Sequence, residues 1–229
     1  MAGETKEILE TRRNFYAFLY RMYLEEPPRE LAEDLVNEKI SFPDLIALDE
    51  ELSEVFLGLK EFMEKNKSKE VDELHEELID EYTLLFIGPH RLPVQPYESW
   101  WVDGKLMGES LLKVKRDCRK AGIVKAKDYA EPEDHIAFEL KFMHFLCEEE
   151  LSNFSLAKKR FLECLNQQKD FLNDHLLRWM PDFCDALYEC ELSDFYKCIA
   201  KLTKGFLLLE DAVIEELLEM ETKDAEGRA

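Results

Sequence analysis

Residues 193–220 read SDFYKCIAKLTKGFLLLEDAVIEELLEM, and this stretch decides the fold class. Its apolar residues recur at alternating intervals of four and three: Phe195, Ile199, Leu202, Phe206, Leu209 and Val213, with Met220 continuing the row. This spacing is the 3.6-residue period of an amphipathic helix, and the Ser193 hydroxyl suits an N-cap. The stretch therefore predicts one long helix that begins next to Ser193.

The same period returns in other parts of the chain. One stripe is formed by Val71, Leu74, Leu78, Tyr82 and Leu85, and another by Ile136, Leu140, Met143 and Cys147. Phe138, Phe142 and Phe145 widen the apolar arc of the second stripe, which predicts a central helix. Because period-two alternation is nearly absent, we expect an all-α fold, a bundle of about ten helices.

The helical pattern is interrupted by one long irregular stretch. Gly88-Pro89 ends the helix before it, and Gly122 ends the next long helix. Between Gly88 and Gly104 the sequence is GPHRLPVQPYESWWVDG, which holds three of the eight prolines and two of the three tryptophans. A loop of this length in a helical protein is usually functional or a hinge. We therefore expect a single domain, 1–229, with halves 1–88 and 105–229 joined by a functional loop at 89–104.

Composition limits the partners of this chain. Its 46% hydrophobic content provides for a core, and 30 Lys and Arg against 51 Asp and Glu give a formal net charge of −21. A field of this sign repels nucleic acid and anionic lipid and favours cationic partners. No window has the roughly 18 uncharged apolar residues that a spanning helix needs, so we expect no membrane insertion.

The N-terminal segment contains a motif of the export type. Residues 11–16, TRRNFY, resemble a twin-arginine motif, but Arg21 and Glu25 interrupt the apolar region that a signal peptide would need next. The apolar residues after Arg13 have helical spacing instead, which predicts an amphipathic helix. The six cysteines include no CxxC pair and favour reduced thiols. We therefore expect a cytoplasmic protein.

Signatures of catalysis are absent from the sequence. It contains no GxSxG elbow, no Walker A loop and no GxGxxG motif, so we expect no catalytic residues. The segment 113–127 carries seven Lys and Arg against one acid, Asp117. A solvated basic face is favoured there over an anion or nucleotide site.

The segment EPEDH, residues 131–135, precedes the Phe-rich helix. Pro132 suits the first helical position, and Glu131 suits the positive end of the helix dipole. Glu131, His135 and Glu139 would then share one helix face, but such a set is too common in a Glu-rich chain to predict a metal. We predict no metal and no cofactor, and we expect Asp134 and His135 to tie the helix start to the 89–104 loop.

Taken together, these motifs resemble a known family. Glu81-Tyr82, LFIGP at 85–89, Leu92-Pro93, PYES at 96–99 and EPEDH at 131–135 are similar in order and spacing to the TorD/DmsD family of cytoplasmic molybdoenzyme-maturation chaperones, which is more distantly related to NarJ. The two blocks span about a third of the chain. Trp100-Trp101 departs from the pattern, since many members have a small or β-branched residue followed by an aromatic one.

This resemblance implies a chaperone that binds the twin-arginine signal peptide of a molybdopterin or tungsten oxidoreductase subunit and holds that subunit back from export until its cofactor is inserted. The partners would be this peptide and the catalytic subunit, with the molybdenum cofactor or a guanine nucleotide as open further ligands. The protein would be a monomer or a domain-swapped dimer. The resemblance places the peptide site at His90, Leu92, Pro93, Pro96, Tyr97, Glu98, Trp100, Pro132, Asp134 and His135.

The chemistry of such a peptide agrees with these residues. Carboxylates at Glu98 and Asp134 are expected to meet the two guanidinium groups, and Tyr97 and Trp100 to cover the apolar stretch that follows. Two other classes stay open. One is a metal- or nucleotide-dependent hydrolase that uses Asp134, His135 and the basic segment, and the other is an assembly subunit of a membrane oxidoreductase.

Overall fold

The fold is all-α, as predicted. The structure, a computed structural model, describes residues 2–40, 50–88, 92–127 and 129–226. In these ranges the elements are α1 (Ala2–Leu24), α2 (Arg29–Val36), α3 (Glu50–Asn66), α4 (Val71–Tyr82), η2 (Thr83–Ile87), α5 (Glu98–Asp103), α6 (Glu109–Lys120), α7 (Ile136–Asn153), α8 (Lys158–Phe171), η3 (Leu172–Leu176), α9 (Leu177–Glu189) and α10 (Asp194–Glu226). Both η elements are π-helical turns. Within the same ranges, strand-like pairing is limited to one isolated bridge between Tyr97 and His135.

The chain forms two compact units that are not consecutive in sequence. The first contains Met1–Tyr20, Tyr97–Met180 and Leu207–Ala229, and the second contains Arg21–Pro96 and Pro181–Phe206. One boundary, between Pro96 and Tyr97, falls inside the 89–104 segment. The expected organisation as one domain with halves 1–88 and 105–229 stays a prediction.

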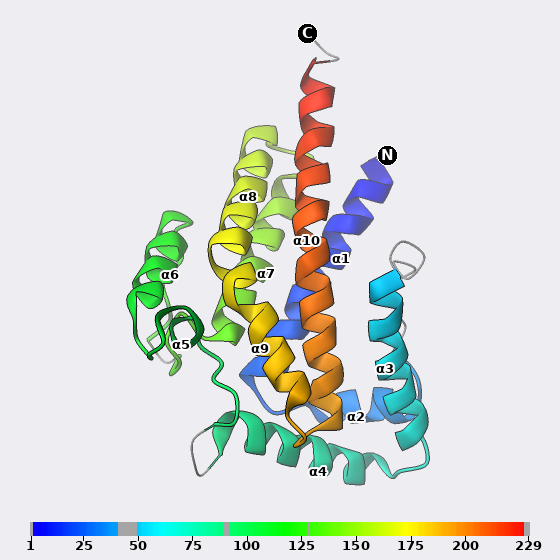
Figure 1. The fold of residues 1–229 in the computed structure, drawn as a ribbon. Coiled ribbons are helices and arrows are strands. Elements are labelled where there is room, and N and C mark those ends of the chain that lie inside the picture. The colour runs from blue at the N-terminus through cyan, green and yellow to red at the C-terminus, as the bar shows by residue number, and fades with distance from the viewer. Residues whose placement is uncertain (1, 41–49, 89–91, 128, 227–229) are drawn as a thin grey trace. The chain divides into compact units, whose positions relative to one another are not determined.

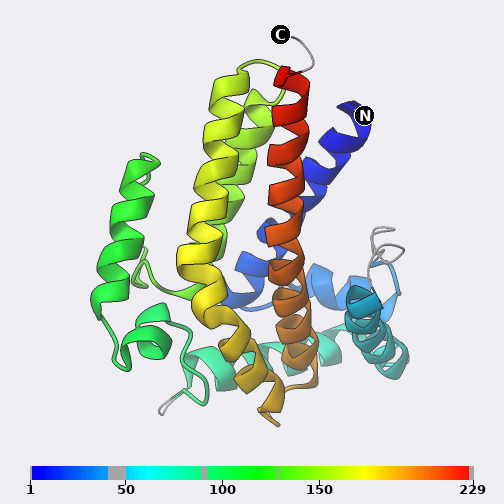
Figure 2. The same cartoon turned by 45° about the horizontal axis from the view of Figure 1, so that its top comes forward.

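The first unit is built around α7 and α8, which run side by side in both views (Figures 1 and 2). The predicted stripe of α7 is its buried face, because Ile136, Leu140, Met143 and Cys147 are all fully buried. Phe142 of α7 and Phe171 of α8 join the two helices, with ring centroids 4.6 Å apart. The expectation that the Phe-rich helix is central is confirmed for this unit.

In the second unit, α2 packs against α3 and α4, and α4 buries Leu74, Leu78 and Tyr82 as the pattern predicts. Phe86 lies among three aromatic rings of the same unit: Tyr82, Tyr23 and Tyr196. The predicted cap of α10 is also present, because the Tyr196 N–H donates to Ser193 Oγ at 2.7 Å. Gly88 ends η2 with a positive φ of 42°. In the first unit, Gly122 follows α6 with a φ of 80°.

The long C-terminal helix departs from its predicted face after Phe206. Up to that residue the expected positions are buried, but beyond it the buried residues are Leu207, Glu210, Ile214 and Leu217. Met220, which was expected to continue the stripe, is 40% exposed. The buried face therefore moves by one residue at the boundary between the units, and it carries a carboxylate, Glu210.

Glu210 is buried because it binds Arg12, the first arginine of the TRRNFY motif. The Arg12 side chain donates from Nε to Glu210 at 2.8 Å, from Nη1 to Glu150 at 3.0 Å and from Nη2 to Gln168. All of these residues belong to the first unit. The motif lies within α1, as the helical spacing predicts, and its first arginine is a structural residue only 3% exposed.

No helix in the described ranges is both long and apolar enough to cross a membrane. The six cysteines are free, and four of them are buried.

Candidate functional site

The start of α5 lies against the EPEDH segment in the first unit. Tyr97 and His135 form the antiparallel bridge, and the Glu98 N–H donates to the Asp134 carbonyl oxygen at 2.9 Å. The Ser99 N–H donates to Asp134 Oδ2 at 3.2 Å. Asp134 thus binds two of the N–H groups that the first turn of a helix leaves without partners. The prediction that Asp134 and His135 tie this segment to the 89–104 loop is confirmed.

His135 caps the next helix and is neutral. Its Nδ1 accepts a hydrogen bond from the Ala137 N–H at 3.2 Å, so this nitrogen carries no proton. Burial lowers the pKa of His135 to about 4. The ring packs edge-on against Tyr97, with centroids 5.2 Å apart. His135 therefore supplies a cap and an aromatic surface, but no charge, at neutral pH.

Tyr97 links the bridge to the acidic end of the EPEDH segment. Its hydroxyl donates to Glu131 Oε2 at 2.7 Å, and Lys125 Nζ donates to the Glu131 carbonyl oxygen at 2.8 Å. Burial, together with the Glu131 carboxylate, raises the pKa of Tyr97. The phenol therefore stays protonated and acts as a donor.

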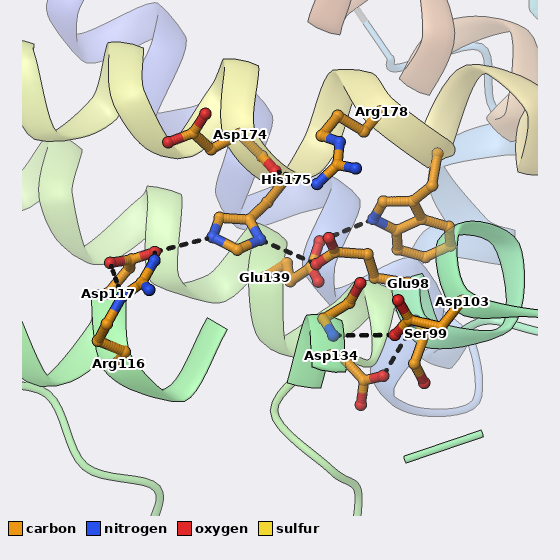
Figure 3. A network of polar contacts seen from close by, with 12 residues as sticks. Glu98, Ser99, Asp103, Arg116, Asp117, Asp134, Glu139, Asp174, His175 and Arg178 are labelled. Atoms are coloured by element: carbon orange, nitrogen blue, oxygen red, sulfur yellow. Dashed lines mark hydrogen bonds and ion pairs between the residues drawn. The ribbon is translucent and has the colours of Figure 1, made fainter. Parts of the chain in front are cut away.

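Glu98 lies at one end of a chain of polar contacts that reaches the surface through His175 (Figure 3). His175 Nδ1 lies 2.9 Å from Glu98 Oε2, and His175 Nε2 lies 3.2 Å from Asp117 Oδ2. Glu98 and His175 are buried, whereas Asp117 is partly exposed and also binds Arg116 and Lys120. Burial alone would raise the pKa of Asp117, but its hydrogen bonds to these cations and to His175 outweigh it and leave the pKa well below its usual range.

A second carboxyl group, that of Glu139 on α7, lies next to Glu98. Its Oε2 accepts a hydrogen bond from the Trp179 indole N–H at 3.0 Å, and both side chains are fully buried. Burial and the neighbouring Glu98 carboxylate raise the pKa of Glu139 well above its ordinary value. The core of this site therefore contains an acidic pair with an aromatic donor.

Two residues of the expected peptide site are buried in this structure. Glu98 and Asp134 were expected to meet guanidinium groups of a peptide, but they are 0% and 1% exposed. Both carboxylates are turned toward groups of the protein itself, Glu98 toward His175 and Asp134 toward Ser99. They position the site, and in this conformation they do not reach a ligand directly.

The local secondary structure also differs from the prediction at two points. Residues 98–103 of the expected loop form α5, because Asp134 binds its first N–H groups and Gly104 ends it with a φ of 71°. The helix expected from Pro132 begins instead at Ile136, because the Asp134 carbonyl oxygen accepts from Glu98 rather than from the next helical turn. Glu131 and His135 therefore do not share a helix face with Glu139. The described residues contain no cluster of metal-ligating side chains.

The remaining residues of the expected peptide site lie in different places. Trp100 and Pro132 are half-buried in the first unit. Leu92, Pro93 and Pro96 belong to the second unit, and His90 lies outside the described residues. The assignment of all ten residues to a peptide site stays a prediction.

The basic segment after Leu112 is largely used within the first unit. Lys115 lies 3.4 Å from Glu133, and Arg116 and Lys120 bind Asp117. Lys125 donates to the Glu131 carbonyl oxygen. These contacts agree with a basic face that balances nearby acids, which the sequence favoured over an anion site.

Three contributors to the site were missed or misread from the sequence. His175 and Trp179 carried no motif, although both lie on one side of the helical stretch from η3 to α9, four residues apart. From the sequence, Glu139 was considered only as a metal ligand on a shared helix face with Glu131 and His135. The scarcity of Trp and His, with three and five in the chain, was the one signal that could have directed attention to them.

The turn between α5 and α6 depends on Gly108. A Cβ atom at this position would lie 2.2 Å from Asp103 Oδ2, the atom that accepts the Ser110 N–H at 2.9 Å and so caps α6. We expect Gly108→Ala to lower the free energy of unfolding by about 1–3 kcal/mol, because the capping side chain must move. Urea unfolding measures this change. Gly58→Ala is the control, because its Cβ would meet only Cys198 Sγ at 3.9 Å and because alanine is favoured over glycine in a helix. An equal change in the free energy of unfolding of both variants would contradict the steric argument.

The site belongs to an all-α chain whose acidic and histidine side chains hold its own backbone and one another. The family model of the nitrate reductase delta subunit matches residues 46–185. This is more than half of the sequence, and the chain therefore belongs to this family.

Individual relatives agree with this family. Chaperone protein TorD of Vibrio cholerae serotype O1 is 26% identical over 226 residues, which cover 96% of this chain and 99% of that protein. Tat proofreading chaperone DmsD of Salmonella typhi is 31% identical over 131 residues, covering 56% of this chain and 58% of that protein. A solved structure from Archaeoglobus fulgidus, described as a candidate redox enzyme maturation protein, has a TM-score of 0.46 and 23% identity and covers 86% of this chain and 93% of its own.

The names of the two curated relatives confirm the resemblance to TorD and DmsD. The curated relatives are named as chaperones and not as enzymes, in agreement with the expectation of a non-catalytic protein. The chain is therefore similar to chaperones of the TorD and DmsD type.

Proposed function

We propose that this protein works in the cytoplasm, binds the twin-arginine signal peptide of a molybdopterin or tungsten oxidoreductase subunit, and delays export of that subunit until its cofactor is in place. The observation that carries this proposal is the meeting of PYES and EPEDH. Ser99 and Asp134 are 35 positions apart in the chain and are joined by a hydrogen bond. The two motifs on which the family resemblance rests thus form one continuous structure.

The charge of the protein supports a cationic ligand. A net charge of −21 attracts a cationic peptide, over a range that screening limits to about 8 Å at physiological ionic strength. Because Glu98 and Asp134 are buried, we assign the short-range contacts to Glu131 and Glu133, which flank Pro132 and are partly exposed. A guanidinium group would replace Lys115 at Glu133 and approach Glu131 beside the Tyr97 hydroxyl.

An apolar surface for the rest of the signal peptide is available on the same segment. Tyr97 and Trp100 are both half-buried, and we assign this surface to their side chains. Aromatic side chains of this kind pack against apolar residues and also stack on guanidinium planes. Binding needs no covalent step, which fits the absence of catalytic motifs.

The proposal is tested by calorimetric titration of the whole protein with the leader peptide of an oxidoreductase subunit from the same organism. A second leader, with both arginines replaced by alanine, is the matched control. We expect the native leader to bind at least tenfold more tightly, because truncating one partner of a desolvated charge pair costs about 2–5 kcal/mol. The affinity for the native leader should also fall as salt is added.

Three outcomes would contradict this proposal. Equal affinity for both leaders would remove the role of charge and leave only apolar capture. No binding of any leader from the same organism would remove signal peptide recognition itself. Stable co-purification with a membrane oxidoreductase, without leader binding, would favour the assembly subunit.

A further inference from the structure

The buried carboxyl groups of Glu98 and Glu139 are each satisfied at one oxygen only. Glu98 Oε2 contacts His175 and Glu139 Oε2 accepts the Trp179 N–H. No donor in the described residues reaches Glu98 Oε1 or Glu139 Oε1, although both atoms are buried. Two neighbouring carboxylates are acceptors only, so they cannot bind each other unless one of them carries a proton.

His175 requires a proton count of its own. Both of its ring nitrogens lie at hydrogen-bond distance from carboxylate oxygens, 2.9 Å from Glu98 and 3.2 Å from Asp117. A neutral imidazole has one N–H, so it could donate to only one of them. Only an imidazolium ring, with an N–H on both nitrogens, donates to Glu98 and Asp117 at the same time.

We propose that Glu98 and Glu139 hold one proton between them at neutral pH, and that this proton and the His175 ring position the start of α5. The raised pKa of Glu139, caused by burial and by the Glu98 carboxylate, agrees with this assignment. Glu139, Trp179 and His175 are then positioning residues, because they act on the site through Glu98. Their effect on peptide binding rests on the proposed function, whereas the proton itself does not.

Burial, Glu98 and Asp134 favour the protonated form of Glu139. Glu98 on α5 and Asp134 before α7 face it with negative charge, and the neighbouring thiol of Cys118 on α6 keeps its proton because its pKa is raised, first by burial and then by Glu139. The Trp179 N–H donates to Glu139 Oε2 and favours the charged form, but burial and the two negative neighbours outweigh this effect on the pKa of Glu139. His175 contacts Glu98 on the other side.

Loss of the shared proton would act directly on α5. Glu98 is the first residue of this helix, and its N–H is bound to the Asp134 carbonyl oxygen. With both carboxylates charged, their repulsion in a buried site would push Glu98 away from Glu139 and loosen this contact. The candidate site is therefore intact only while the proton is held.

The test uses Glu139→Gln, which imitates the protonated state. The glutamine can accept the Trp179 N–H and donate to Glu98. Infrared difference spectra at neutral pH should show a protonated carboxyl band that is present in the natural protein and lost in this variant. The exposed Glu216→Gln is the matched control and should keep the band.

Unfolding measured across pH supplies a second readout. A carboxyl group with a raised folded pKa stabilises the protein fully below the ordinary carboxyl pKa, and this stabilisation is lost as the pH rises through the raised pKa. We therefore expect the stability of the natural protein to fall as the pH rises from the ordinary carboxyl pKa through the raised pKa of Glu139, and Glu139→Gln to lose less over the same range. If this variant does not fold, Glu98→Gln serves instead, since its amide can donate to Glu139 while its oxygen still accepts from His175. Retention of the band, or a pH profile identical to that of the natural protein, would overturn the proposal.

Leader titration separates this inference from the proposed function. The natural protein should lose affinity from neutral to alkaline pH, and Glu139→Gln should keep it. Absence of leader binding by both proteins, with the infrared band still lost in the variant, would contradict signal peptide binding and leave the shared proton standing. Leader binding with the same pH dependence in both proteins would overturn the positioning role of the proton.

Discussion

Replacing Arg12 by alanine is expected to lower the free energy of unfolding by about 3–5 kcal/mol, because it leaves buried carboxylates without their cation. Arg12 is only 3% exposed and holds Glu150 and Glu210, which are 0% and 1% exposed. Burial already raises the pKa of Glu150, against the opposing effect of Arg12. Without Arg12 both acids must take up protons or draw in water, and either change destabilises the fold.

The neighbouring Arg13 is the matched control for this prediction. It bonds to the adjacent Asn14 at the surface, so Arg13→Ala should change the free energy of unfolding by no more than about 0.5 kcal/mol. Chemical denaturation of both variants measures the difference. The same two substitutions would have equal, small effects if TRRNFY were an exposed recognition motif, and that result would contradict the buried role of Arg12.

Arg12 also illustrates what the sequence could predict and what it could not. The apolar spacing after Arg13 correctly indicated a helix, because periodicity depends only on neighbours along the chain. The partners of Arg12 lie 138 and 198 positions away, and no local pattern records such a pairing. Glu210 is buried in α10 although the local pattern predicts a polar face there, because its partner Arg12 is also distant in the chain.

The candidate site, too, was predictable from the sequence only in part. The contact between the 89–104 segment and EPEDH was predicted from composition and from Pro132, and the structure confirms it. The burial of Glu98 was not predictable, because it depends on His175, which lies 77 positions away and belongs to no motif. The late start of α7 has a similar cause: the backbone of Asp134 pairs with α5, and this tertiary contact overrides the helix-start signal of Pro132.

Replacing Asp134 by alanine is expected to weaken leader binding at least tenfold while costing only about 1 kcal/mol of stability. The loss of binding follows from the freed Ser99 N–H, since Asp134 Oδ2 holds this group and with it the first turn of α5. The stability cost is small because the substitution also removes a buried carboxylate whose pKa is raised by burial and by the nearby Glu98. Calorimetric titration with the leader and urea unfolding measure the two effects on the same protein.

Asp134→Asn distinguishes positioning from direct recognition. The asparagine keeps an oxygen that can accept the Ser99 N–H but carries no charge, so it should retain most of the leader affinity that alanine loses. If asparagine weakens binding as much as alanine does, the negative charge itself meets the peptide, and the buried position of Asp134 describes only the unbound protein. Because 1% exposure leaves no path for a guanidinium group without movement of α5, we expect the asparagine variant to bind.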